Sequence, residues 1–80
     1  MFEDLKTLKH IVGIKQSTRA VECDSVLAAY VAKDADTNVI APFERLCASK
    51  AIPITHIESK KALGEACGIE VDAAVAVILK

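Results

Sequence analysis

Two nearly uninterrupted apolar runs constrain the fold of this chain more than any other feature of its 80 residues. Residues 26–32 read Val-Leu-Ala-Ala-Tyr-Val-Ala, and residues 73–79 read Ala-Ala-Val-Ala-Val-Ile-Leu. Runs of this length with β-branched residues are typical of β-strands that are covered on both faces, because no polar side chain alternates with the apolar ones. Such strands need helices on both sides of their sheet, so the sequence favours an α/β fold.

Helical patterns and shorter strand patterns alternate around these two runs. We expect further strands over 10–13 and 54–57 and helices over 2–8, 15–23, 42–50 and 60–67, while residues 37–41 stay ambiguous. Pro42 suits the first position of a helix, where its missing N–H is not needed. Ser59 suits the N-cap of the last helix, and Gly64 within that helix predicts the close approach of a neighbouring backbone. The order αβαβαβαβ predicts one domain over residues 1–80, a three-layer α/β/α sandwich around a four-stranded mixed sheet.

The composition argues against several classes of protein. No apolar run approaches the roughly 18 residues of a membrane span, and the first residues, Met-Phe-Glu-Asp-Leu-Lys, lack the pattern of a signal peptide, so we expect a cytoplasmic protein. Cys23, Cys47 and Cys67 are widely spaced, which favours free thiols over a disulfide or a metal site. No nucleotide-binding, metalloprotease or esterase motif is present, so we expect neither an enzyme nor a cofactor.

The stretch Gly-Ile-Lys-Gln-Ser-Thr-Arg at residues 13–19 is the best candidate for a binding surface. Its glycine permits a tight turn after the preceding strand, and Lys15 and Gln16 supply hydrogen-bond donors at the start of a helix, where polyanions bind well. Arg19 lies on the same side of that helix as Lys15 because four residues separate them. The formal net charge of the chain is −1, but residues 1–19 contain four basic and two acidic side chains. A local positive patch of this kind suits one shaped nucleic-acid site.

Two further clusters of polar side chains follow predicted strands, Lys33-Asp34 and Ile57-Glu58-Ser59-Lys60-Lys61. In an alternating fold the ends of the strands share one edge of the sheet, so we expect all three clusters to converge there. Lysine and glutamine donate hydrogen bonds to the edges of guanine and adenine, and Ile57 would offer an apolar wall to an unstacked base. The alternative is that the basic side chains are simply solvated surface residues.

The chain also resembles a known family. Four segments carry the resemblance: Gly-Ile-Lys-Gln-Ser-Thr-Arg-Ala at 13–20, Val-Ala-Lys-Asp-Ala-Asp at 31–36, Ile-Pro-Ile at 52–54 and Ser-Lys-Lys-Ala-Leu-Gly-Glu-Ala-Cys-Gly-Ile-Glu-Val at 59–71. Together they resemble the kink-turn RNA-binding ribosomal proteins of the L7Ae family, and above all its short bacterial members. The resemblance covers nearly the whole chain and implies the same α/β/α sandwich.

This resemblance implies binding to a kink-turn, an RNA duplex that a bulge bends sharply beside tandem sheared G·A pairs. The helix after the glycine would enter the groove next to those pairs, and the third cluster would pack on the flipped-out bulge nucleotide. The RNA-binding residues implied by position are Gly13, Ile14, Lys15, Gln16, Arg19, Lys33, Ile57, Glu58, Ser59 and Lys60.

The resemblance leaves the partner open. Archaeal and eukaryotic relatives carry Asn-Glu where this chain has Lys15-Gln16, and an acidic residue where it has Lys33, so their preferred kink-turn sequence does not carry over directly. The RNA would be ribosomal RNA or a structured regulatory RNA such as a riboswitch, and nothing in the chain demands more than a monomer. The alternative is a protein-interaction adaptor of the same fold, with the acidic residues between 34 and 72 facing a protein partner.

Overall fold

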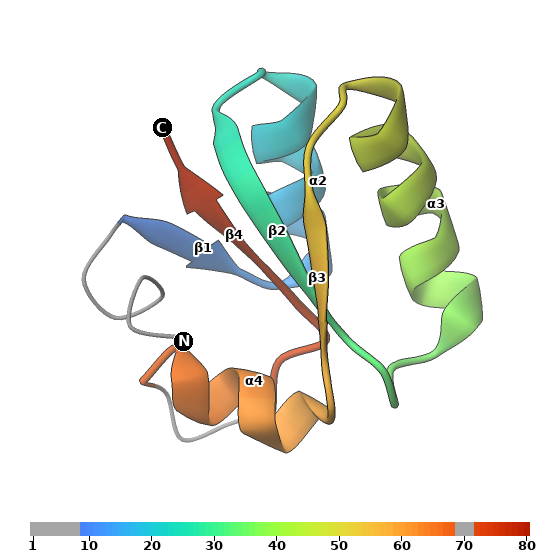
Figure 1. Ribbon diagram of the computed structural model, residues 1–80, viewed down its shortest axis with the longest axis vertical. Helices are drawn as coiled ribbons and strands as arrows, with labels where there is room; N and C mark the ends of the chain where they lie inside the picture. The colour runs from blue at the N-terminus through green and yellow to red at the C-terminus, as the bar shows by residue number, and fades with distance from the viewer. Residues whose placement is uncertain (1–8, 69–71) are drawn as a thin grey trace.

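Strands and helices alternate along the chain in the computed structural model, which describes residues 9–68 and 72–80 (Figure 1). The elements are β1 (His10–Val12), α2 (Ile14–Glu22), β2 (Val26–Ala32), α3 (Thr37–Ser49), β3 (Ile54–Ile57), α4 (Lys60–Ala66) and β4 (Val75–Leu79). The helix predicted over residues 2–8 lies outside the described residues. Within the described part of the chain, no helix combines the length and apolar character needed to cross a membrane.

The two apolar runs form the inner strands of a four-stranded sheet with the order β1-β4-β2-β3. Strand β4 is antiparallel to both β1 and β2, whereas β2 and β3 are parallel. The prediction of a mixed sheet is therefore confirmed. Central strands lose water on both faces, which explains why β2 and β4 are apolar nearly throughout while the edge strand β3 carries two exposed polar residues.

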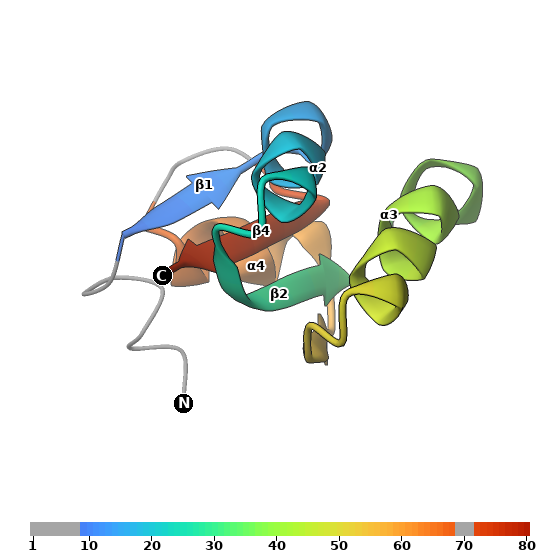
Figure 2. The same ribbon diagram turned by 90° about the horizontal axis from the view of Figure 1, so that it is seen from above.

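Helices cover both faces of the sheet. The side chains from Val75 to Ile78 are at most 2% exposed, although consecutive residues of a strand point to opposite faces. Helices α2 and α3 lie side by side on one face, and α4 lies on the other (Figure 2). Phe43 from α3 and Leu63 from α4 are among the largest fully buried side chains. The predicted three-layer α/β/α sandwich is confirmed.

The prediction for Pro42 is wrong, because α3 begins at Thr37 and contains this proline in its interior. The Asp36 carboxylate accepts a hydrogen bond from the backbone N–H of Asn38 at 2.9 Å, which is an N-cap interaction. Proline deprives the Asn38 carbonyl of its helical N–H partner. Both residues are exposed, so this carbonyl lies on the side of the helix that water can reach.

Candidate nucleic-acid interface

Strands β1, β2 and β3 end at the edge of the sheet where β4 begins, at its lower end in Figure 1. Backbone hydrogen bonds join the segments that meet there. The N–H of Gly13 donates to the carbonyl of Val75 at 3.1 Å, and the N–H of Lys33 donates to the carbonyl of Ile57 at 2.8 Å. Between these two hydrogen bonds, the N–H of Ala32 donates to the carbonyl of Ala74 at 2.9 Å. We call the turns gathered at this edge, residues 13–16, 33–34 and 57–61, the rim.

The first turn of the rim depends on Gly13. Its φ of 108° lies in a region that L side chains rarely adopt, and it lets the chain pass directly from β1 into α2. The side chain of Ile14 is half-buried, whereas those of Lys15 and Gln16 are exposed. Neither exposed side chain has a hydrogen-bond or ion-pair partner among the described residues. The turn therefore presents two unpaired donors to the solvent.

The second and third turns are tied together by a side chain. The Asp34 carboxylate accepts a hydrogen bond from the backbone N–H of Lys60 at 2.7 Å. Sequence reasoning treated Asp34 as part of a surface cluster and missed this role, because the two residues are 26 positions apart. Lys33 is exposed and its ammonium group has no partner within the described residues. The Asp34 carboxylate therefore holds the two turns together, and the ammonium group of Lys33 is free to contact another molecule.

The third turn leads into α4. Ser59 is the N-cap, as predicted, since its hydroxyl accepts a hydrogen bond from the N–H of Ala62 at 3.0 Å. Glu58 is exposed and Lys60 is partly exposed. The expectation that Ile57 offers an apolar wall to a base is wrong for its side chain, which is 3% exposed and belongs to the core. Ile57 contributes to the rim only through its backbone.

Arg19 lies one helical turn beyond Lys15 and is exposed. It has no partner in the described part of the chain. Together with Gln16 it borders an open groove of about 420 Å³ between α2 and the strands β1 and β4. The structure thus brings the three predicted clusters to one edge and places Arg19 on the flank of α2, next to that edge.

The histidine, cysteine, aspartate and glutamate side chains of the described residues form no group of three or more that could hold a metal ion. Cys47 and Cys67 are buried in the core, and burial raises the pKa of both thiols. Cys23 is exposed at the end of α2. The exposed side chains of the rim include those of Lys15, Gln16, Lys33 and Glu58.

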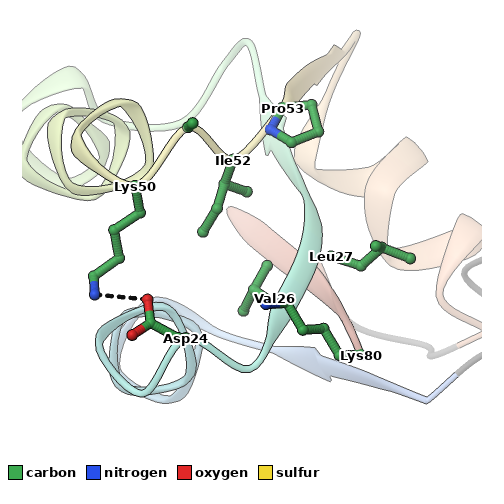
Figure 3. A pocket seen from close by; sticks show the side chains of 8 residues that line it. Asp24, Val26, Leu27, Lys50, Ile52, Pro53 and Lys80 are labelled. Atoms are coloured by element: carbon green, nitrogen blue, oxygen red, sulfur yellow. Dashed lines mark hydrogen bonds and ion pairs between the residues drawn. The ribbon is translucent and has the colours of Figure 1, made fainter.

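The opposite end of the sheet is built differently (Figure 3). A pocket of about 210 Å³ lies there between the turns that follow α2 and α3, beside Leu27. The ammonium group of Lys50 lies 2.8 Å from the carboxylate of Asp24 and donates to the carbonyl of Glu22 at 3.5 Å. The hydrogen bond from Lys50 to the Asp24 carboxylate and the positive charge of Lys50 lower the pKa of Asp24. Here the lysine joins two elements of the protein.

Comparison with known proteins gives a consistent result. Residues 3–80 match the family described as ribosomal protein L7Ae/L30e/S12e/Gadd45. An RNA-binding protein of Bacillus pumilus is 45% identical over 69 residues, which cover 86% of this chain and 84% of that protein. An RNA-binding protein of Halalkalibacterium halodurans is 41% identical over 70 residues, with coverage of 88% and 85%.

Solved structures extend the comparison to the fold. The 15.5kD RNA-binding protein of Giardia lamblia superposes with a TM-score of 0.83 at 30% identity. The match covers 89% of this chain but 60% of that longer one. A Bacillus halodurans protein of unknown function gives a TM-score of 0.81 at 22% identity, which shows the shared fold alone.

Proposed function

Because the chain belongs to the ribosomal protein L7Ae/L30e/S12e/Gadd45 family, we propose that it binds RNA through the rim and that this RNA is a kink-turn. One observation carries the proposal. A line of backbone hydrogen bonds from Gly13 through Ala32 to Ile57 holds three turns together, and the turns present Lys15, Gln16 and Lys33 without protein partners in the described chain. A surface of fixed shape with free donors suits recognition of a folded RNA.

The first turn reads the bases in this proposal. Lys15 and Gln16 stand at the start of α2, and their donors suit the O6 and N7 acceptors of guanine in the sheared pairs. The deep groove of A-form RNA is normally too narrow for side chains, but the sharp bend of a kink-turn opens it beside those pairs. Gly13 and the half-buried Ile14 fix the direction in which this helix enters.

The other two turns grip the RNA on either side of the bend. Lys33 reaches the guanine side of the pairs, and Lys60 approaches the phosphate backbone. Glu58, Ser59 and the backbone of Ile57 surround the flipped-out bulge nucleotide. Arg19 contacts phosphates further along the same duplex.

We propose that the chain acts as a monomer, with residues 1–80 as one RNA-binding domain in the cytoplasm. Its target is ribosomal RNA or a structured regulatory RNA, because both classes contain kink-turns. Crosslinking followed by sequencing of the bound cellular RNA identifies the target. Recovery of protein partners without RNA would favour the adaptor reading of the fold.

Electrophoretic mobility shift tests the proposal directly. A duplex with one kink-turn is compared with an otherwise identical duplex in which the sheared G·A pairs are replaced by Watson–Crick pairs. We expect retention of the first RNA and much weaker retention of the second. Equal retention of the two RNAs, or none of either, contradicts kink-turn recognition.

A further inference from the structure

A groove of about 420 Å³ runs along the flank of α2 and begins at the rim. Ile11 from β1 and Leu79 from β4 form its apolar floor, and Gln16 and Arg19 from α2, with Cys23 directly after the helix, form one wall. These three wall residues follow each other at intervals of three and four, so they make one stripe along the helix. The volume of the groove falls in the range of about 300–1,000 Å³ that small-molecule sites occupy.

The wall of the groove carries the same kind of groups as the rim. Among the described residues that line it, Arg19 carries the only charge and none is acidic. Neither Arg19 nor Gln16 has a hydrogen-bond or ion-pair partner in the described part of the chain. Gln16 belongs to both surfaces, so an RNA that touches the rim at α2 already lies at the mouth of the groove.

The floor of the groove suits a flat apolar surface. Ile11 and Leu79 are partly buried and pack against the hydrophobic core, so they are held in place without a ligand. An aliphatic floor beside an amide and a guanidinium group matches the parts of a nucleotide, which are the face of a base, its hydrogen-bonding edge and a phosphate. Both faces of a base that is stacked in a duplex are covered by its neighbours. A base that enters the groove must therefore be unpaired.

We propose that this groove holds an unpaired nucleotide of the bound RNA, next to the duplex that α2 contacts. The proposal rests on the proposed function, since the RNA must first be held at the rim. The base lies on Ile11 and Leu79. The side-chain carbonyl oxygen of Gln16, which the guanine contact leaves free, accepts a hydrogen bond from the edge of the base, and the Arg19 guanidinium group pairs with the phosphate that joins this nucleotide to the duplex. The class of ligand is thus a kink-turn RNA with an extra unpaired nucleotide in the stem beside α2.

Cys23 provides a way to close the groove without changing its other residues. It is exposed, whereas Cys47 and Cys67 are 0% and 6% exposed, so a bulky maleimide reacts with Cys23 in the folded protein. The Cys23→Ser variant has no thiol at this position and is the matched control for the reagent. Mass spectrometry confirms one added group on the wild-type protein and none on the control.

The binding experiment uses two kinds of RNA with the same kink-turn. One has fully paired stems, and a set of others carries one extra unpaired nucleotide at successive positions of the stem beside α2. We expect one position to raise the affinity about tenfold, as burial of one base face predicts. Labelled wild-type protein loses this preference but still binds the paired RNA, while Cys23→Ser keeps the preference after exposure to the maleimide.

A second pair of variants tests the phosphate contact. Arg19→Met should abolish the preference for the unpaired nucleotide, measured as the ratio of the two affinities. Arg45→Met, at an exposed position on α3 away from the groove, should leave that ratio unchanged. Equal affinities for every RNA in the set, or a preference that survives labelling of Cys23, overturns the nucleotide site while rim binding stands. Failure of unlabelled wild-type protein to bind any kink-turn RNA refutes the proposed function itself.

Discussion

The two ends of the sheet use lysine in opposite ways. At the end beside Leu27, the ammonium group of Lys50 lies 2.8 Å from the Asp24 carboxylate and links the turns that follow α2 and α3. At the rim, the side chains of Lys15 and Lys33 have no partner among the described residues. The acidic residue nearest in sequence, Asp34, is already engaged by the backbone N–H of Lys60 at 2.7 Å.

This difference separates lysines that pair within the protein from lysines whose charge the described chain leaves unpaired. A lysine that pairs within the protein adds to the cohesion of the fold, although an exposed pair contributes little. Other lysines stay unpaired beside a backbone that other contacts hold rigid. Their ammonium groups can form ion pairs with another molecule. Substitutions at the two ends should therefore change different measured quantities.

The largest effect should come from reversing the charges at the rim. The double variant Lys15→Glu/Lys33→Glu should weaken binding to a kink-turn by about 30-fold or more, since each specific contact contributes roughly 1–3 kcal/mol. Its melting temperature should stay close to that of the wild type. Arg45→Glu/Lys80→Glu changes the net charge equally at exposed positions away from the rim and is the control. Equal losses in both double variants would mean that net charge governs the binding.

A second test concerns helix α4, which follows the third turn of the rim. Gly64 is buried within α4, so Gly64→Leu forces a large side chain into a packed position and should lower the free energy of unfolding by roughly 1–3 kcal/mol. Glu65→Leu places the same side chain at the neighbouring exposed position and should have little effect. Chemical denaturation measures both. An unchanged midpoint for Gly64→Leu would show that no backbone approaches closely there.

A smaller effect distinguishes two serines at opposite ends. Ser59→Ala removes the N-cap of α4 and should lower the free energy of unfolding by about 1 kcal/mol. Ser49→Ala removes an exposed hydroxyl that donates to the Leu46 carbonyl near the end of α3, and should change that free energy by less than about 0.5 kcal/mol. If the two variants melt at the same temperature, the cap does not help to hold the rim.

The smallest effect is the pH dependence of the Lys50–Asp24 pair. The hydrogen bond and charge of Lys50 hold the pKa of Asp24 below its ordinary value of 3.8 in the folded protein. A depressed folded-state pKa adds stability above the unfolded value and loses it as the pH falls through the folded value. Lys50→Met should therefore lower the melting temperature slightly at neutral pH, and the difference from wild type should vanish in acid. A difference that persists at low pH would assign the role of Lys50 to packing of its stem.

Local sequence signals located most of the elements. Strand β2 and the edge strand β3 begin and end where their patterns predict, and Ser59 caps α4. The sequence pattern misplaces the start of α3, because Pro42 favours a first helical turn five residues after Thr37, whereas the helix begins directly after the N-cap Asp36. The available cue was an aspartate directly before Thr37, with Asn38 in position to donate to it.

The sequence predicted where the candidate site lies in the fold, but it predicted only some of the side chains that the site exposes. Polar residues at the ends of strands indicated the rim, because strand ends of an alternating fold meet at one edge. Ile57 was expected to face the ligand, whereas it lies in the core. The sequence around a single apolar residue with polar neighbours does not determine whether its side chain faces the core or the solvent. The packing of a helix over the sheet determines that direction.

By itself, the sequence determined that this protein is a layered α/β sandwich. Apolar runs as long as 26–32 and 73–79 must be covered on both faces, whatever their neighbours are. Only the tertiary structure decided that β4 lies between β1 and β2, which places Gly13 beside Val75, and that β3 pairs with the other side of β2, which places Lys33 beside Ile57. These pairings join residues far apart in the chain, and they depend on how the whole core packs rather than on the preference of any one segment.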